Sequence, residues 1–223
     1  MIKMYKNIGF VFLILLAFVM AGFFKTYWVF LPHLNFPATA TAVTHFHAMV
    51  MSLWVLLLIG QPLLIKYKKT QLHRILGKVT YVLAPLVVAS VIGLLIRNYH
   101  RDNMRIWPFW DQMQGVYFGA IHSLQFIVFY ILALIYRRNT ALHGGFMIAT
   151  GVVLINPAVV RIWLHLFHLP FSIAQTITCS TTFTAMLLLV LAARRRQMDY
   201  RFLLVIWSTF LLYDIPMLYL IWA

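Results

Sequence analysis

Seven long runs of apolar residues, separated by polar connectors, constrain the fold of this chain more than any other feature. A helix needs about 20 mostly apolar residues to cross the hydrocarbon core of a bilayer. Inside lipid each segment must satisfy its own backbone groups, so runs of this length are expected to be helices rather than barrel strands. The predicted spans are roughly residues 8–31, 43–65, 75–96, 115–136, 142–164, 171–193 and 200–222.

The composition agrees with a membrane location. Hydrophobic residues make up 63% of the chain and charged residues 10%, against about 45–50% and about 25% in ordinary soluble domains. The one cysteine, Cys179, excludes a disulfide within the chain. We therefore predict an all-α protein, a single transmembrane domain over residues 1–223 with seven helices around a four-helix core of the second to fifth spans. Lys25 interrupts the first apolar run. The basic start and apolar stretch of this run also fit a signal peptide.

The charges predict an orientation. The chain has 18 Lys and Arg residues against 4 acidic ones, with no glutamate. Most of the cations fall on one face if the connector between the second and third spans is inside, which is the positive-inside pattern. We expect the plasma (bacterial inner) membrane, with a cytoplasmic N-terminus and an external C-terminus. Short basic clusters between apolar runs fit lipid headgroups better than nucleic acid.

Nine histidines in so apolar a chain are the main functional signal. Ionisable residues at membrane depth are costly and often functional. Alternate helices of an up-and-down bundle run parallel, so His47 and His122 are expected at one outer depth, and His73 and His143 at one inner depth. Two opposed imidazoles are the axial ligands of a low-spin haem. The pattern predicts two b-type haems, one near each leaflet, and an electron path between them.

Helical spacing extends the prediction along the second span. One face of that helix carries His47, Met51, Trp54, Leu58 and Gln61. Gln61 lies roughly 21 Å from His47 along this face and is expected to hydrogen-bond a cofactor edge. A two-residue step turns about 200°, so His45 cannot share the face. Arg74, next to His73, is expected to hold a haem propionate.

A different site competes for the outer histidines. Three imidazoles, or two with a carboxylate, bind zinc or copper and can activate water. This alternative is a metal site for membrane hydrolysis or metal delivery, formed from His45, His47, His122, His165, His168 and Asp214, with Asp111 nearby. If Asp214 has a purely structural role instead, it is expected to form a buried ion pair with Arg161. A third alternative is a non-catalytic assembly or receptor-like protein in which the histidines only pack.

Two resemblances follow from these motifs. The segment from His47 through Gln61 to His73-Arg74-Ile75-Leu76-Gly77 resembles an uncharacterised family of bacterial multi-pass membrane proteins. His143-x-x-x-Met147 is similar to that family's second motif, and the resemblance covers about residues 43–165. It implies a fold more than an activity.

The second resemblance is architectural. Four histidines on four successive helices are similar to the transmembrane dihaem cytochromes that take electrons from ascorbate or quinol. This resemblance implies a quinol or small reductant as the electron donor. No covalent haem attachment is expected, because the CxxCH motif is absent.

Overall fold

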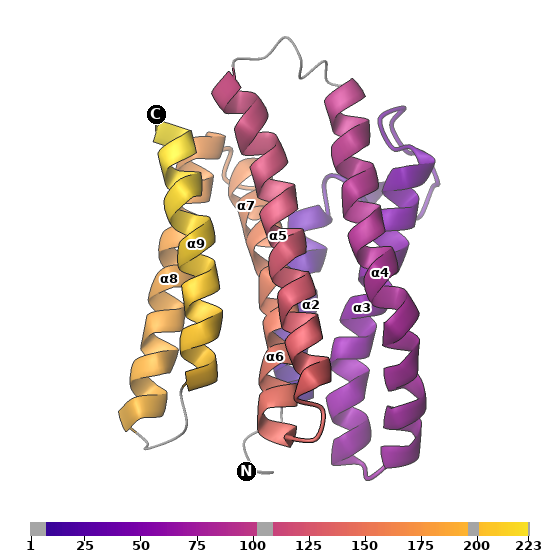
Figure 1. The fold of residues 1–223 in the computed structure, drawn as a ribbon. Helices are drawn as coiled ribbons and strands as arrows, with labels where there is room; N and C mark the ends of the chain where they lie inside the picture. Colours follow the sequence, from indigo (N-terminus) through magenta and orange to yellow (C-terminus); the bar gives the residue numbers. More distant parts are fainter. Residues whose placement is uncertain (1–7, 102–108, 196–200, 223) are drawn as a thin grey trace. The chain divides into compact units, whose positions relative to one another are not determined.

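The structure is a computed structural model that describes residues 8–101, 109–195 and 201–222 (Figure 1). Within these ranges all regular secondary structure is helical. The chain divides into two compact units, Met1–Trp107 (unit 1) and Pro108–Ala223 (unit 2), and each is described by itself. The predicted core of the second to fifth spans therefore does not form one compact unit. Its first two helices belong to unit 1 and the others to unit 2.

Unit 1 is built on a helical hairpin. Its elements are α2 (Ile8–Phe23), the 3-10 helix η1 (Trp28–Phe30), α3 (Ala42–Lys66) and α4 (Thr70–Arg101). The turn between α3 and α4 is tight, and Lys68 adopts a left-handed conformation there with φ of 59°. Trp54 and Leu58, on the predicted face of α3, are buried.

The first predicted span, residues 8–31, is shorter as a helix than expected. Helix α2 ends at Phe23 and the chain turns around Lys25. The start of α2 packs on the end of α3, where a Cβ on Gly9 would lie 2.9 Å from the Leu63 side chain. Beyond the turn, Tyr27 hydrogen-bonds His45 at 3.0 Å, near the start of α3. Leu63 and His45 are eighteen residues apart, so the segment follows about 27 Å of α3.

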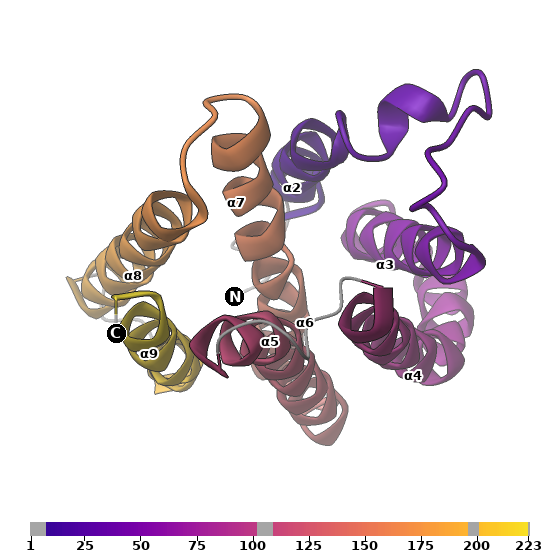
Figure 2. The same ribbon diagram turned by 90° about the horizontal axis from the view of Figure 1, so that it is seen from above.

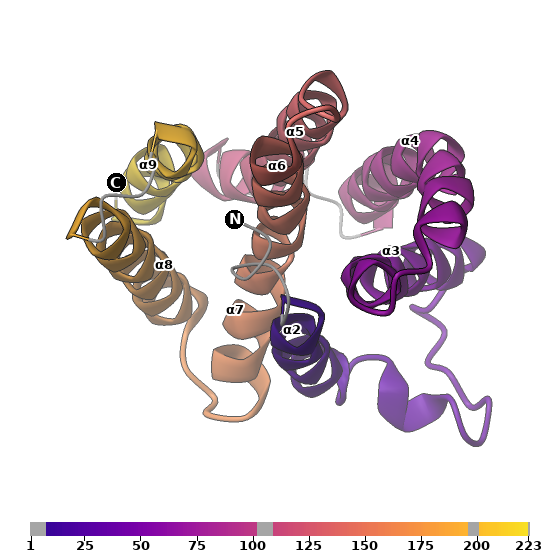
Figure 3. The same cartoon turned by 90° about the horizontal axis from the view of Figure 1, so that it is seen from below.

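Unit 2 contains α5 (Phe109–Ile135), α6 (Thr140–Val153), α7 (Ile155–His165), α8 (Phe171–Arg195) and α9 (Arg201–Trp222). Asn139 caps α6, since its side chain accepts hydrogen bonds from the next helical N–H groups. Helix α9 packs against α5, α6 and α8, and it lies between α5 and α8 in Figures 2 and 3. The apolar core of these helices comprises Phe129, Ala133, Phe146, Ala149, Val153, Met186, Ile206 and Phe210.

The fifth predicted span, 142–164, is broken into α6 and α7 at Leu154. Pro157 is the third residue of α7, and proline has no N–H and clashes with the carbonyl four residues earlier. This proline accounts for the break in the helix. Asn156, beside it, is 1% exposed.

Among the described residues, six helices are long and apolar enough to cross a membrane: Ala42–Lys66, Thr70–His100, Val116–Ile135, Thr140–His165, Phe171–Arg195 and Arg201–Trp222. They also keep large apolar side chains on their outer surfaces, such as Leu56, Val82 and Leu212. Exposed apolar side chains of this size are typical of surfaces that contact lipid. The described helices are therefore those of a multi-pass membrane protein.

Candidate functional site

The first candidate ligand, His47 on α3, is held by α4. Its Nδ1 lies 2.9 Å from Ser90 Oγ. The Ser90 hydroxyl already donates its hydrogen to the Val87 carbonyl at 2.6 Å. A hydroxyl has one hydrogen, so Ser90 accepts from His47 Nδ1–H. In the neutral ring this tautomer puts the lone pair on Nε2, the nitrogen that would ligate iron.

The second candidate, His122 on α5, is 8% exposed. Its Nδ1 lies 2.5 Å from the Phe118 carbonyl, one turn earlier on the helix. A carbonyl only accepts, so Nδ1 carries the proton and Nε2 carries the lone pair. No donor among the described residues reaches this buried Nε2. The ring packs edge-on against Tyr213 of α9, at 4.4 Å between ring centroids.

The third candidate, His143, lies at the start of α6 and has the same tautomer as His122. Its Nδ1 donates to the Ala133 carbonyl on α5 at 2.8 Å, which leaves the lone pair on Nε2. This bond also joins the two helices of the α5–α6 hairpin. Metal-bound histidines generally donate their other ring N–H to such an oxygen, which fixes the tautomer and the ring orientation.

The fourth candidate, His73 on α4, differs. Both polar atoms of the Gln61 amide form hydrogen bonds in one orientation. Nε2 then donates to His73 Nδ1, and Oε1 accepts from the Gly77 N–H at 3.2 Å. An Nδ1 that accepts leaves the proton of the neutral ring on Nε2. Gln61, expected to bond a cofactor edge, is thus bonded to the neighbouring helix. Arg74, the expected propionate partner, is exposed on the first turns of α4.

Each unit presents its two candidate histidines at well-separated levels. In unit 1, His73 is bonded to Gln61, which is fourteen residues from His47 and thus about 21 Å away along α3. In unit 2, His143 is bonded to Ala133, eleven residues and about 17 Å from His122 along α5. The two members of each predicted pair belong to different units. Pairing therefore stays a prediction.

The outer residues of the alternative metal site have other surroundings. His45 is directed away from His47, as predicted. Its Nδ1 bonds the Tyr27 hydroxyl, and its ring packs edge-on against Phe36 at 4.5 Å.

In unit 2 the other members of that alternative are spread over three elements. His165 ends α7, His168 is exposed in the loop between α7 and α8 with φ of 54°, and Asp214 is buried in α9. Across the described side chains, no group of three His, Cys, Asp or Glu residues is placed to hold one metal ion. Asp111 lies outside the side chains that the structure describes.

The predicted Asp214–Arg161 ion pair is not formed. Arg161 donates to the Pro157 carbonyl at 2.8 Å, whereas neither Asp214 oxygen receives a hydrogen bond from a described nitrogen or oxygen donor. The i to i+4 bond keeps the guanidinium against its own helix. Asp214 lies instead beside the Cys179 thiol.

The sequence-based prediction missed a buried polar group in unit 2. Gln175 Nε2 donates to the Tyr213 hydroxyl at 2.9 Å and to Cys179 Sγ at 3.2 Å. Gln175, Cys179 and Tyr213 are each at most 1% exposed. The signal in the sequence is the pair Gln175 and Cys179, four residues apart and therefore on one face of a membrane-spanning helix.

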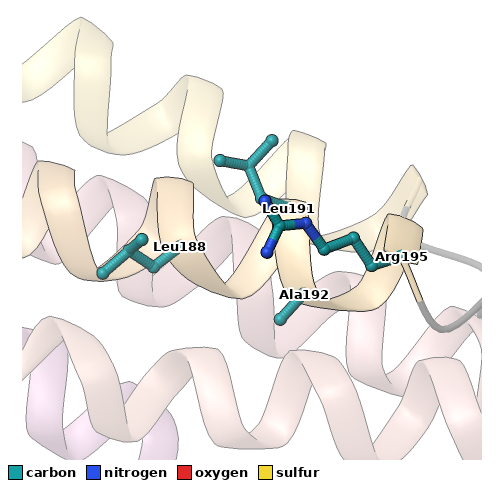
Figure 4. Close-up of a pocket in the computed structure, with 4 residues that line it drawn as sticks. All are labelled: Leu188, Leu191, Ala192 and Arg195. Carbon is teal, nitrogen blue, oxygen red and sulfur yellow. The ribbon is translucent and has the colours of Figure 1, made fainter.

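A surface hollow of about 430 Å³ lies near the C-terminal end of α8, lined by Leu188, Leu191, Ala192 and Arg195 (Figure 4). The lining is apolar except for the guanidinium, a combination suited to lipid tails and headgroups. No candidate histidine lines this hollow.

Comparisons with known proteins add no assignment. No protein-family model matches the chain, and the chain matches no curated protein and no solved structure.

Proposed function

We propose that this chain is a membrane-embedded b-type haem protein that transfers electrons across or within the bilayer. His47 and His122 would ligate the outer haem iron, and His73 and His143 the inner one. Bound haem would supply a one-electron redox centre at each level. A quinol or another small reductant is the proposed electron donor.

The observation that carries this proposal is the shared tautomer of three candidate ligands. His47, His122 and His143 each donate Nδ1–H to an oxygen, from Ser90 or from a main-chain carbonyl. Each ring therefore presents the Nε2 lone pair, the form in which histidine binds a metal. The same tautomer at three positions on three helices is the one that ligation requires, and this agreement supports the proposal.

The spacing of the levels supports two haems rather than one. The separations of about 21 Å along α3 and about 17 Å along α5 agree within about one helical turn. Within each unit, the two candidate ligands are therefore too far apart to bind the same haem, so each belongs to a separate haem in this proposal.

The inner site needs a local rearrangement. His73 must move its proton from Nε2 to Nδ1 before Nε2 can bind iron. If the Gln61 amide turns over, its oxygen accepts that Nδ1–H, but the amide then loses its bond to Gly77. We therefore propose that the inner haem is held more weakly than the outer one.

The proposed orientation puts the basic connectors in the cytoplasm of a bacterial cell. In unit 1 the turn between α3 and α4 carries Lys68 and Lys69, and in unit 2 the turn between α5 and α6 carries Arg137 and Arg138. The segment from α2 to Tyr27 follows α3 over about 27 Å, close to the thickness of about 30 Å of the hydrocarbon core. We propose that it is the seventh crossing, with the N-terminus inside.

The test is an absorption spectrum of protein purified after expression with an adequate haem supply. We expect red protein whose visible band sharpens when dithionite reduces the iron. Colourless protein would contradict the proposal. Stoichiometric zinc or copper without haem would favour the outer metal site, and neither haem nor metal would favour the assembly or receptor-like role.

A further inference from the structure

Unit 2 contains a buried acceptor cluster, which we define as His122, Gln175, Cys179, Tyr213 and Asp214. It connects three helices: His122 comes from α5, Gln175 and Cys179 from α8, and the remaining two from α9. All five side chains are at least nine-tenths buried. The Gln175 bonds to Tyr213 and Cys179, and the packing of the His122 ring on Tyr213, place them in one group.

The cluster holds more hydrogen-bond acceptors than donors. Both Asp214 oxygens, Gln175 Oε1 and His122 Nε2 are buried and receive no hydrogen bond from a described nitrogen or oxygen donor. The Gln175 amide hydrogens go to Tyr213 and Cys179, and His122 Nδ1–H goes to Phe118. The Cys179 thiol beside Asp214 is only a weak donor.

An ionised carboxylate is unstable in such surroundings. A buried charge needs a counter-charge or several strong donors, and this Asp214 has neither among the described residues, since Arg161 bonds its own helix. A multivalent metal is not favoured, because His122, Cys179 and Asp214 do not form a group able to hold one ion. A proton neutralises the carboxylate without adding volume, and it converts one acceptor into a donor.

The titratable groups around Asp214 are few. Helix α5 contributes Tyr117 and His122, helix α8 contributes Cys179, and Tyr213 is the neighbour on α9. From α6, which also packs on α9, the described titratable side chain is His143, bonded to Ala133. None of these groups carries a positive charge in the tautomers described above.

We propose that this cluster is a proton-binding site inside the membrane, in which Asp214 holds one exchangeable proton as a neutral carboxylic acid. The acid O–H donates to Gln175 Oε1, directly or through a water molecule. When the proton leaves, it passes to water, and the carboxylate becomes the acceptor again. The site goes beyond the proposed haem function and does not use His122 Nε2, which is a proposed iron ligand.

Infrared spectroscopy tests the proposal on the full-length protein, with or without haem. The sequence is well suited to it, because it has four acidic side chains, Asp102, Asp111, Asp199 and Asp214, and no glutamate. We expect a carbonyl stretch of a protonated carboxylic acid at neutral pH. The band should shift to lower frequency in D2O and on labelling with aspartate carrying ¹³C in the side-chain carboxyl.

The variant Asp214→Asn should abolish this band, whereas Asp199→Asn, at a connector, should keep it. If Asp214→Asn does not fold, the variant Asp214→Glu should fold and shift the frequency of the band. A wild-type band that does not shift with the ¹³C label does not come from aspartate and would also overturn the proposal. Absence of the band from the wild type, its survival in Asp214→Asn, or the lack of a D2O shift would each overturn the proposal.

Discussion

The two units treat their buried acceptor atoms differently. In the described part of unit 1, each buried side-chain acceptor has a donor, as in the chain from His47 through Ser90 to the Val87 carbonyl. In unit 2, acceptors of five side chains are buried without one: His122, Gln125, Asn156, Gln175 and Asp214. Buried polar atoms normally find partners, so unsatisfied ones mark places where a ligand, a water or a proton belongs. In the proposed haem protein, unit 1 would supply ligands whose other ring nitrogen is already bonded, whereas unit 2 would also keep buried acceptors that a water or a proton can satisfy.

The largest expected effect comes from removing an outer ligand in either unit. His47→Ala and His122→Ala should each abolish one of the two haems, because a low-spin iron needs both imidazoles. The loss should be equal although the two rings have different surroundings. Haem content per chain, measured on purified protein, is the readout.

His45→Ala is the matched control for this experiment. It lies two residues from His47 on the same helix but packs against Tyr27 and Phe36, so its haem content should stay at the wild-type level. If the two ligand variants lose different amounts of haem, His47 and His122 do not bind the same haem, which would contradict the proposal.

The second prediction concerns the residues behind the unit 1 ligands. Ser90→Ala removes the acceptor of His47 Nδ1–H and should weaken the outer haem by about 10- to 100-fold, the usual cost of such a loss. Gln61→Glu should instead raise the affinity for the inner haem, because a carboxylate accepts a hydrogen bond from His73 Nδ1–H and leaves the Nε2 lone pair for iron. Haem titration of the apoprotein measures both. An unchanged affinity in both variants would contradict the tautomer argument.

The third prediction compares two buried polar groups within unit 2. Gln175→Leu removes the donor to Tyr213 and should destabilise the protein by about 1–3 kcal/mol. Asp214→Leu removes two oxygens that have no nitrogen or oxygen donor, together with the acid O–H proposed to donate to Gln175, so its net effect should be smaller than that of Gln175→Leu. Thermal unfolding in detergent compares them. A large loss for Asp214→Leu would mean that Asp214 has a structural partner after all.

The smallest effect is a packing test. A Cβ on Gly145 of α6 would lie 2.7 Å from the Phe202 ring of α9, so Gly145→Ala should cost about 1 kcal/mol or more. Gly77→Ala in unit 1 has no heavy atom within 4 Å of the added Cβ and should be tolerated. Equal melting temperatures for the two variants would show that α6 and α9 are less closely packed in unit 2.

The spans were predictable because length and hydropathy determine them directly. The second predicted span, 43–65, agrees closely with Ala42–Lys66, and the sixth, 171–193, with Phe171–Arg195. The first was overextended, since the apolar run continues past Phe23 although the helix ends there. Hydropathy depends only on how apolar the side chains are, so it does not detect a helix that ends inside an apolar run.

The candidate site was predictable only in part. The spacing rule correctly separated His45 from His47, which bond to Tyr27 and Ser90 respectively. The acceptor that each ring nitrogen finds depends on how neighbouring helices are rotated, which the spacing along one helix does not specify. For the same reason the grouping of Gln175 and Tyr213 from two helices was missed.

The most direct test of the central claim is low-temperature electron paramagnetic resonance of the oxidised, haem-loaded protein. Opposed imidazoles at both levels predict low-spin ferric signals in the wild type, with one signal lost in His122→Ala and the other unchanged. A wild-type spectrum that is entirely high spin, or a His122→Ala spectrum identical to wild type, would contradict ligation by these histidines.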